Sequence, residues 1–318
     1  WAVAAKSART AYVRVTARAA PGGLGDAVAI SLPIRPCVRE RTWNAAGVVT
    51  GGAAEHVIEL APEAGDVLPQ VTVRLTPTVL AAIGPGLKYL IEYPYGCTEQ
   101  TVSSFLPDLL VARLLRTVDR RTASEMRRTI PREQLRALPD MVRAGVSRLR
   151  SLQLEGWAWW DAGEPDPWLT AYATMALGYA ARDGYEIPRA MATSAVDSCR
   201  AQAQRASPDT AAFLSYALAL INAKPLPRRD VSAMSAPGLA CVILEDRCRG
   251  HRTAAGHAAY ERLRRLAVSS GSFVRWRAGR DVLYGSLTST ALALQAIVAC
   301  DPPSPPIEPC LRYLMAAR

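Results

Sequence analysis

The chain has 318 residues, 50% of them hydrophobic, which is enough for a sizeable core and more than one domain. Its formal net charge is +10, but the basic residues are spread over many predicted helices. This argues against nucleic-acid binding, because no basic stripe is interleaved with aromatic residues. No apolar run is long enough to span a membrane, so we expect no membrane contact here. The chain begins without a methionine and ends inside a helical pattern, and we expect a piece of a longer protein.

Residues 1–76 are predicted to form part of a β-sandwich. Apolar and polar residues alternate at 11–15, 56–60 and 71–75, and glycine pairs and prolines separate these runs. Short strands with turn signals between them are typical of a sandwich. We interpret His56 as a strand-surface residue, and we find no catalytic pattern in this segment.

The hydrophobic period becomes helical from residue 77, and residues 77–318 are expected to form a second, mainly α domain. A hairpin made of 271–276 and 282–284 is expected between two of its helices. The periodicity predicts helices over 78–92, 103–118, 131–154, 169–181, 188–204, 209–223, 238–246, 253–267 and 286–300, and a last one from 306.

Three of these helices share a pattern of small residues. The runs that begin at Thr170, Thr210 and Thr288 resemble one another, with helix starts near 169, 209 and 287. This spacing indicates a two-helix repeat of about 40 residues with one irregular unit. Alanine-rich faces allow close packing, as in the inner layer of a ring of helices.

The segment 155–168 contains four tryptophans and is predicted to be a loop or a small hairpin. They are Trp157, Trp159, Trp160 and Trp168. We interpret them as a packed plug at the rim of the helical ring. The functional alternatives are that Trp159, Trp160 and Trp168 shield a reactive group nearby, or that the tryptophans dock on neighbouring domains.

The stretch 93–100, Tyr-Pro-Tyr-Gly-Cys-Thr-Glu-Gln, carries the strongest chemical signal. At a helix start, residues i and i+3 lie on one face, so the Cys97 thiol and the Gln100 carboxamide can touch. A helix N-terminus favours the thiolate, and proximity lowers the barrier to acyl transfer. Attack of sulfur on the carboxamide carbon with loss of ammonia would leave an internal thioester.

Neighbouring residues fit that chemistry. Gly96 permits a close approach of the backbone before the cysteine. Tyr93 and Tyr95 can shield the bond from water, because a dry site slows hydrolysis. Glu99 is a candidate for assisting proton transfer, although a first-turn acid also suits a helix start. Only three of the 38 basic residues are lysines. A shortage of amines would spare a thioester from self-reaction, although a composition bias towards arginine explains the same count.

The seven cysteines contain no CxxC pair, and we expect neither a metal nor a cofactor. An odd count suggests one special thiol and up to three disulfides, with Cys241–Cys248 and Cys300–Cys310 close enough in sequence to bridge. That interpretation predicts an oxidising compartment. The alternative is that these cysteines are ordinary buried thiols.

The stretch around Cys97 resembles the thioester motif of the α2-macroglobulin and complement superfamily, and it looks most like the bacterial α2-macroglobulins. The Trp-Ala-Trp-Trp run at 157–160 and the run 164–173 are similar to another block of that family's thioester domain. Residues 26–33 and 42–60 look like its flanking β domain, either CUB-like or macroglobulin-like. The likeness is weakest over 225–285.

The resemblance implies an α/α-toroid thioester domain in a protease inhibitor, acting by single-use trapping and not by turnover. A protease would cut a bait region elsewhere, and its lysine amines would attack the Gln100 acyl carbon and free Cys97. The expected partners are proteases and neighbouring macroglobulin-like domains. The protein would be periplasmic or extracellular, with any membrane anchor outside this chain.

Some complement relatives carry a histidine that redirects the acyl group to hydroxyls. The resemblance places that position near Asp209, but no histidine lies between His56 and His251. We therefore expect direct aminolysis, and we interpret His251 and His257 as surface residues. The chain also ends before the family's last helices and returning strands.

Two other functions remain open from the residues alone. One is a toroid-type hydrolase or cyclase, whose only candidate acid cluster is Asp161, Glu164 and Asp166. The other is a protein-binding domain in which Cys97 is structural and unreactive.

Overall fold

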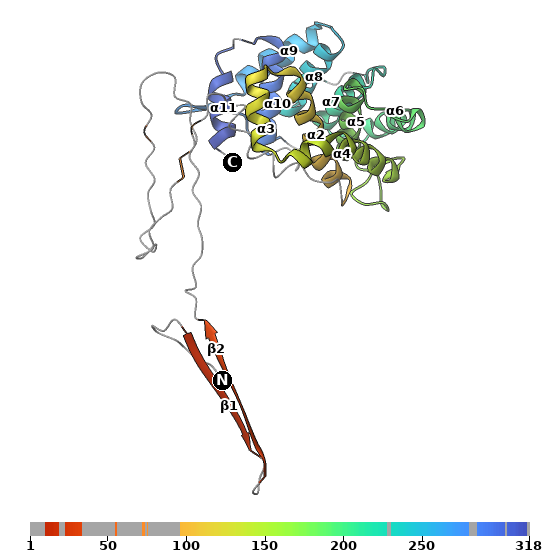
Figure 1. Cartoon of the computed structure of the whole chain (residues 1–318). Coiled ribbons are helices and arrows are strands. Elements are labelled where there is room, and N and C mark those ends of the chain that lie inside the picture. Colours follow the sequence, from red (N-terminus) through yellow and green to blue (C-terminus); the bar gives the residue numbers. More distant parts are fainter. Residues whose placement is uncertain are drawn as a thin grey trace. The chain divides into compact units, whose positions relative to one another are not determined.

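The computed structural model describes residues 10–18, 23–33, 55, 72, 73, 75, 96–227, 230–279, 285–302 and 304–316. The chain divides into two compact units, residues 1–45 and 46–318. Figure 1 draws both, with the helices and strands labelled.

The first unit contains an antiparallel hairpin of β1 (Thr10–Arg18) and β2 (Gly25–Pro33). Thr10 lies opposite Pro33 and Arg18 opposite Gly25. This register brings together, on one exposed face, the apolar residues Ala11, Val13, Val15, Val28, Ile30 and Leu32. The hairpin confirms the strand predicted at 11–15. The strand predicted at 56–60 and His56 lie outside the described residues, and Thr72, Val73 and Leu75 are described without regular structure.

The second unit is mainly helical. Its described elements are α2 (Thr98–Thr117), α3 (Arg120–Thr129), α4 (Arg132–Ser151), β3 (Gln153–Leu154), β4 (Gly156–Trp157), α5 (Pro167–Arg182), α6 (Arg189–Ala203), α7 (Pro208–Leu220), the 3₁₀ turn η2 (Val231–Ala233), α8 (Ala236–Cys248), α9 (Ala254–Arg265), β5 (Val268–Ser270), β6 (Phe273–Arg275), α10 (Ser286–Cys300) and α11 (Ile307–Ala316).

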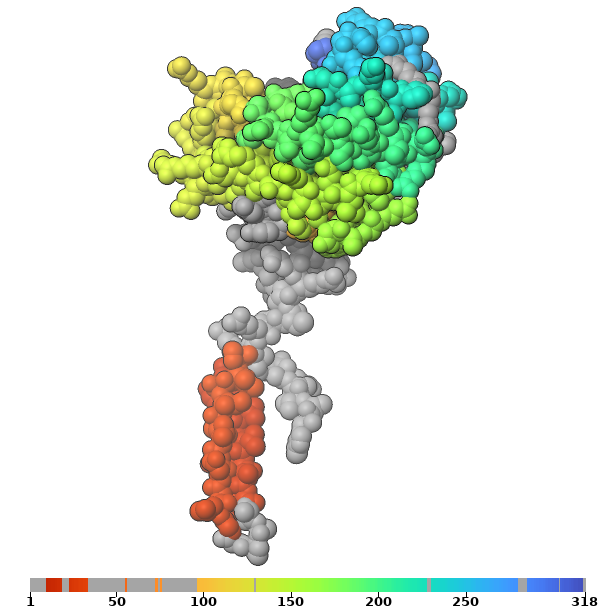
Figure 2. Space-filling model, turned by 90° about the vertical axis from the view of Figure 1, so that its right-hand side faces the viewer, coloured from red at the N-terminus to blue at the C-terminus, as the bar shows by residue number. Residues whose placement is uncertain are grey.

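The helices form two layers. In the inner layer α2, α5, α7, α8 and α10 contact one another in that order. In the outer layer α4 packs on α2, α6 on α5 and α7, α9 on α8, and α11 on α10 (Figure 1). In the space-filling view, the chain coloured from yellow to cyan forms one continuous surface (Figure 2).

Burial explains which helices are inner. Every residue from Asp209 to Leu220 of α7 is buried, and so is every residue from Ala236 to Asp246 of α8. A helix that is apolar on all sides must be covered on all sides. The outer helix α4 buries only one stripe. It lies close to α2, because a Cβ on Gly145 would stand 2.4 Å from the Phe105 ring.

A local arrangement that we name the first tryptophan station joins α4 to α5. After α4, the β3–β4 hairpin leads into Trp157, which is completely buried. Its Nε1–H donates to the Leu149 carbonyl near the end of α4 at 2.9 Å. Its backbone N–H donates to Thr170 Oγ1, in the first turn of α5, at 3.1 Å. The tryptophan thereby ties an outer helix to the next inner one.

The same arrangement recurs between α9 and α10, as the second tryptophan station. Here Trp276, also completely buried, follows the β5–β6 hairpin. Its Nε1–H donates to the Leu263 carbonyl at 2.8 Å, and its backbone N–H to Thr290 Oγ1 at 3.0 Å. The two stations are therefore copies of one arrangement. Their contacts match Thr170 with Thr290, whereas the sequence pattern matched it with Thr288.

Two predictions about elements are corrected. The strand at 273–275 pairs with Val268–Ser270, and residues 282–284 lie outside the described ranges. Helix α3 was not predicted, because its residues are mostly polar. It forms because Asp119 caps it, accepting hydrogen bonds from the N–H groups of Arg121 and Thr122. The helix predicted at 78–92 lies outside the described residues.

Candidate functional site

The turn that precedes α2 brings the two predicted reactive residues together. Cys97 is the N-cap of α2, and Gly96 before it has a φ of 91°. Gln100 folds back, so that its Oε1 accepts a hydrogen bond from the Cys97 N–H at 3.2 Å. The Cys97 side chain in turn faces the backbone N–H of Gln100. The two contacts together form a capping box, in which a thiol replaces the usual hydroxyl.

Glycine is required at position 96. Its positive φ disfavours other residues, and a Cβ there would stand 2.1 Å from Gln100 Oε1. The absence of a side chain therefore lets the carboxamide lie against the backbone. This is the close approach that the sequence predicted for Gly96.

The thiol and the carboxamide differ in exposure. Cys97 is only 5% exposed, whereas Gln100 is exposed. Thr101 fixes the turn by donating to the Cys97 carbonyl from its N–H at 2.9 Å and its Oγ1 at 2.8 Å. A buried nucleophile and an accessible acyl group therefore lie within one helical turn, which suits acyl transfer.

The tryptophan segment contacts this turn through its backbone. Thr98 donates from its N–H to the Trp159 carbonyl at 3.2 Å and from its Oγ1 to the Ala158 carbonyl at 2.6 Å. Trp159 and Trp160 are 42% and 61% exposed. The structure therefore brings the segment to Cys97, with Trp157 fully buried and Trp159 and Trp160 exposed.

Trp168 lies in a different environment. Its ring centroid is 4.8 Å from that of Tyr172 and 6.1 Å from that of Phe213, within the helical core. It therefore packs between α5 and α7. The other two predicted shielding residues, Tyr93 and Tyr95, lie outside the described residues.

Glu99 belongs to a short polar chain on the side of α2. Its Oε1 accepts a hydrogen bond from Ser103 Oγ at 2.5 Å, and Ser103 Oγ lies 3.2 Å from the Tyr172 hydroxyl. Burial raises the pKa of Tyr172, so this hydroxyl stays protonated at neutral pH. Glu99 is thus hydrogen-bonded to Ser103, one turn further along α2, and Ser103 links it to Tyr172 in α5.

Sequence reasoning missed Arg148. This residue of α4 donates from Nη2 to the Gly96 carbonyl at 3.1 Å, across 52 positions of sequence. No motif marks it, because it is one of many exposed arginines.

The predicted disulfides are wrong for the described cysteines, all of which are free. Cys241 and Cys248 both lie in α8, and seven residues of helix separate their Cα atoms by about 10 Å, too far for a bridge. Cys300 Sγ accepts from Arg247 Nε at 3.3 Å, and Cys310 is fully buried. The alternative of free thiols holds for the described cysteines, of which Cys248 and Cys300 are only partly buried. Cys37 lies outside the described residues.

The thiols buried away from this turn, those of Cys199, Cys241 and Cys310, are poor nucleophiles. Burial raises the pKa of Cys199 to about 12 and that of Cys310 to about 11, and it also raises the pKa of Cys241. These groups stay protonated at neutral pH, and a thiol reacts much more slowly than a thiolate.

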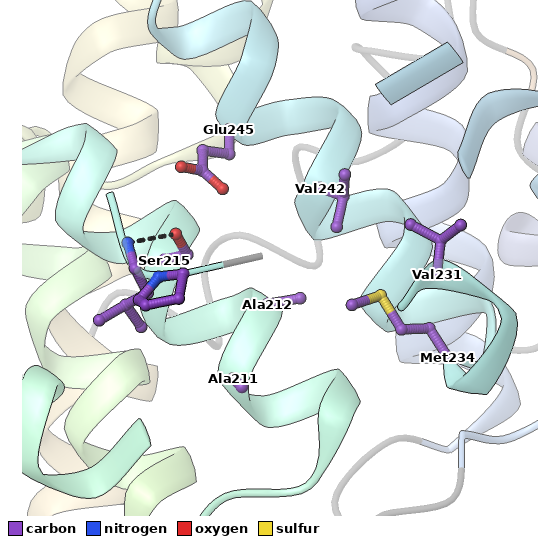
Figure 3. Close-up of a pocket in the computed structure, with 9 residues that line it drawn as sticks. Ala211, Ala212, Ser215, Val231, Met234, Val242 and Glu245 are labelled. Carbon is purple, nitrogen blue, oxygen red and sulfur yellow. Dashed lines mark hydrogen bonds between the residues drawn. The ribbon is translucent and has the colours of Figure 1, made fainter. Parts of the chain in front are cut away.

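A small cavity lies between α7, η2 and α8 (Figure 3). Its volume is about 20 Å³, room for about one water molecule. Its polar groups are already paired: Ser215 Oγ accepts from the Leu226 N–H at 3.3 Å, and Glu245 from Arg249 Nε at 3.1 Å. It is too small for an organic ligand.

Other candidate groups do not converge on Cys97. In the described ranges, no group of three or more His, Cys, Asp and Glu side chains is placed to hold a metal ion. His251 and His257 are exposed, as predicted. No described helix is long and apolar enough to cross a membrane.

Comparison with known proteins explains this arrangement. The profile of the A-macroglobulin TED domain, the thioester domain, matches residues 70–197, which include Cys97, Gln100 and the first tryptophan station. An alpha-2-macroglobulin of Thermotoga maritima is 26% identical over 179 residues, 56% of this chain. Residues 70–197 are a thioester-domain segment of the bacterial alpha-2-macroglobulin type. The predicted resemblance is confirmed.

Other relatives agree, and all are much longer. The alpha-2-macroglobulin of Escherichia coli K12 is 38% identical over 106 residues, 32% of this chain. The matched stretch is 10% of the Thermotoga relative and 6% of the E. coli one.

The fold of this alpha-2-macroglobulin segment matches solved structures. A crystal structure of Salmonella alpha-2-macroglobulin reacted with methylamine is 21% identical, over 76% of this chain and 16% of that one, with a TM-score of 0.51. At this identity the likeness shows the fold. The predicted mainly α, toroid-type fold is confirmed, with a small β-hairpin before it.

Proposed function

We propose that Cys97 and Gln100 form an internal thioester in a covalent protease trap of the alpha-2-macroglobulin type. The observation that carries the proposal is the Gln100 carboxamide held against the Cys97 backbone, within the family's thioester domain. The thioester domain would extend over 77–318, and residues 1–76 would belong to a flanking β domain.

The thioester forms by acyl transfer. Cys97 Sγ attacks the Gln100 side-chain carbon, the bond from this carbon to nitrogen breaks, and the thiol proton leaves with the nitrogen as ammonia. In this proposal Glu99 is a candidate for moving that proton. Tyr93, Tyr95, Trp159, Trp160 and Trp168 shield the product from water, Trp168 by supporting the core behind the turn.

The thioester is then consumed once. After a protease cuts a bait region elsewhere in the protein, one of its lysine amines attacks the Gln100 acyl carbon. The carbon–sulfur bond breaks, the amine proton passes to sulfur, and the protease stays amide-linked to residue 100. The Salmonella relative, whose structure was obtained after reaction with methylamine, supports an amine as the nucleophile.

The absence of a histidine between His56 and His251 supports direct aminolysis in preference to transfer to hydroxyls. Asp209, near the expected histidine position, is buried and accepts a hydrogen bond from the Ser235 N–H at 2.8 Å. It therefore serves the start of α8. We expect methylamine to consume the thioester much faster than glycerol at equal concentration.

The partners in this proposal are the trapped proteases and the neighbouring macroglobulin-like domains. A periplasmic or extracellular location follows from the protease-trapping role, since attacking proteases are met outside the cytoplasm. Free cysteines remove the earlier argument from disulfides, so the location rests on the proposed function.

Intact mass of the native chain tests the proposal. A thioester lowers the mass by one ammonia, about 17 Da, and methylamine then adds about 31 Da as a methylamide while it releases a titratable thiol. Cys97→Ala and Gln100→Glu remove the deficit. Cys300→Ala and Gln204→Glu, which change a thiol and a carboxamide outside the turn, keep it.

Peptide mapping gives the decisive outcome. If native Cys97 titrates at once and residue 100 is recovered as unmodified glutamine, the proposal is wrong. Recovery of glutamate at position 100 instead indicates a thioester that formed and was hydrolysed.

A further inference from the structure

We propose that Arg148 is a positioning residue, which aims the Cys97 N–H at the acyl oxygen of Gln100 so that this N–H acts as an oxyanion hole. The inference rests on the proposed thioester and concerns how its acyl carbon is activated. It is carried by two hydrogen bonds made by one peptide group.

The peptide between Gly96 and Cys97 is held at both ends. In a trans peptide the C=O and the N–H point in opposite directions. The Gly96 carbonyl accepts from Arg148 Nη2 at 3.1 Å, while the Cys97 N–H donates to Gln100 Oε1 at 3.2 Å. Rotation of this peptide plane would break both bonds, so the guanidinium fixes the direction of the N–H.

The positive φ of Gly96 makes this control necessary. A glycine rotates freely on both sides, so its own preferences do not set the plane of the next peptide. An anchor from another helix supplies the missing restraint. Arg148 also polarises the Gly96 carbonyl, which makes the N–H of the same peptide a stronger donor.

The packing of α4 on α2 brings Arg148 to the turn. Gly145 lies one helical turn before Arg148 and lets α4 approach the Phe105 ring. Arg148 Nη1 lies 3.5 Å from Ser151 Oγ, which itself donates to the Arg148 carbonyl at 2.8 Å. The guanidinium thus has a second contact on its own helix.

The acyl oxygen gains negative charge whenever the acyl carbon is attacked. In formation the attacker is Cys97 Sγ and ammonia leaves; in consumption the attacker is an amine and Cys97 sulfur leaves. Both steps pass through a tetrahedral carbon with the charge on Oε1. A preorganised N–H at this oxygen stabilises the transition states of both steps. Loss of a direct donor of this kind typically slows the reaction by about 100-fold or more.

The test compares Arg148→Ala and Arg148→Lys with Arg150→Ala, which removes an exposed arginine from the same helix. The rate constant for thiol release by methylamine is measured on the native chain. We expect it to fall about 10-fold in Arg148→Ala, less than for loss of a direct donor. Arg148→Lys restores part of it, and Arg150→Ala matches the wild type.

A vibrational measurement separates positioning from general stability. The thioester carbonyl band is isolated as the difference between spectra before and after methylamine, on protein with ¹³C in the glutamine side-chain carbonyl. Loss of the Cys97 hydrogen bond moves this band to higher frequency in Arg148→Ala, whereas Arg150→Ala leaves it in place. A merely structural role for Arg148 would not move it.

Each outcome decides the inference. An unchanged rate or an unmoved band in an Arg148→Ala chain that shows the mass deficit overturns this inference and leaves the thioester standing. A wild type with unmodified Gln100 overturns both. An Arg148→Ala chain that unfolds like the wild type but carries no thioester supports the inference, because formation of the thioester passes through the same oxyanion. If Arg148→Ala does not fold, the rate constant of thiol release and the carbonyl band are measured on Arg148→Lys and decide in the same way.

Discussion

The two tryptophan stations have the same construction, yet only the first lies beside the turn that carries Cys97. In each, a buried tryptophan after a short hairpin binds a carbonyl of an outer helix and a threonine of the next inner helix. The segment that follows Trp157 then presents the Ala158 and Trp159 carbonyls to Thr98. The segment after Trp276 is described only to residue 279.

This difference teaches that the station itself is a structural device. It locks an outer helix to an inner one wherever the repeat needs it. The first station differs by what is added to it, a backbone segment that receives the start of α2, where the proposed thioester lies. Damage to the shared device should therefore cost both stations similar stability, whereas reactivity should depend on the first alone.

The largest effect on stability is expected from removing the tryptophans. Trp157→Ala and Trp276→Ala each lose a fully buried side chain, which costs about 3–5 kcal/mol of unfolding free energy. Only Trp157→Ala frees the segment that holds Thr98, so only this variant should also shorten the lifetime of the thioester in buffer. Denaturant unfolding and decay of the mass deficit measure the two effects.

Trp157→Phe and Trp276→Phe serve as milder versions if the alanine variants do not fold. Each keeps most of the apolar volume and loses the Nε1–H bond, at a cost of about 1 kcal/mol. Equal thioester lifetimes in the two phenylalanine variants would show that the first station does not support the reactive turn.

The sequence predicted the helices that the two stations connect, but it did not predict how the two stations align with each other. Apolar periodicity and the threonine–alanine runs predicted the helices and a repeat, because closely packed inner helices need small residues and two of them, α7 and α8, are buried on all sides. It matched Thr170 with Thr288 and missed the true partner, Thr290, because the alignment of a repeat depends on the Trp276 hydrogen bond, which no local pattern reveals.

Only the part of the site whose residues are close together in the sequence was predictable. Cys97, Gln100 and the need for Gly96 follow from one helical turn of sequence. Arg148 and Thr98 were missed, because their roles depend on how α4 and the tryptophan segment pack on α2. The disulfides were predicted from short sequence distance, but a shared helix holds Cys241 and Cys248 apart.

Helix α2, which begins after Cys97, also contains the buried acid Asp108. Within the described residues its carboxyl oxygens have no hydrogen-bond partner, and burial raises its pKa from 3.8 to about 8. The folded chain therefore keeps this proton over a range in which the unfolded chain loses it. Stability contributed by the neutral acid is greatest below about pH 4 and is lost as pH rises to about 8.

Asp108→Asn should remove this pH dependence. At pH 8.5 the unfolded wild type gains free energy by ionising Asp108, whereas asparagine ionises in neither state. The variant should therefore be more stable than the wild type by about 1–3 kcal/mol, and at pH 5 the gain should shrink. Urea unfolding at the two pH values measures it, and the exposed Asp140→Asn should keep the wild-type slope. Hydrogen exchange sharpens the comparison, because α2 should lose protection at high pH before α10 does. Parallel pH slopes in Asp108→Asn and wild type would contradict the assignment.

The smallest change in stability is expected from alanine at two glycines that have similar backbone angles. These variants also separate most clearly an effect on stability from an effect on thioester formation. Gly96 and Gly184 have φ values of 91° and 87°, so alanine at either position costs about 1–2 kcal/mol of backbone strain. At Gly184 a Cβ meets nothing within 4 Å, whereas at Gly96 it stands 2.1 Å from Gln100 Oε1. Gly96→Ala must therefore push the carboxamide off the Cys97 N–H. We expect similar unfolding free energies for the two variants, a normal mass deficit in Gly184→Ala and none in Gly96→Ala. A full deficit in Gly96→Ala would mean that the thioester does not need the close approach seen at this turn.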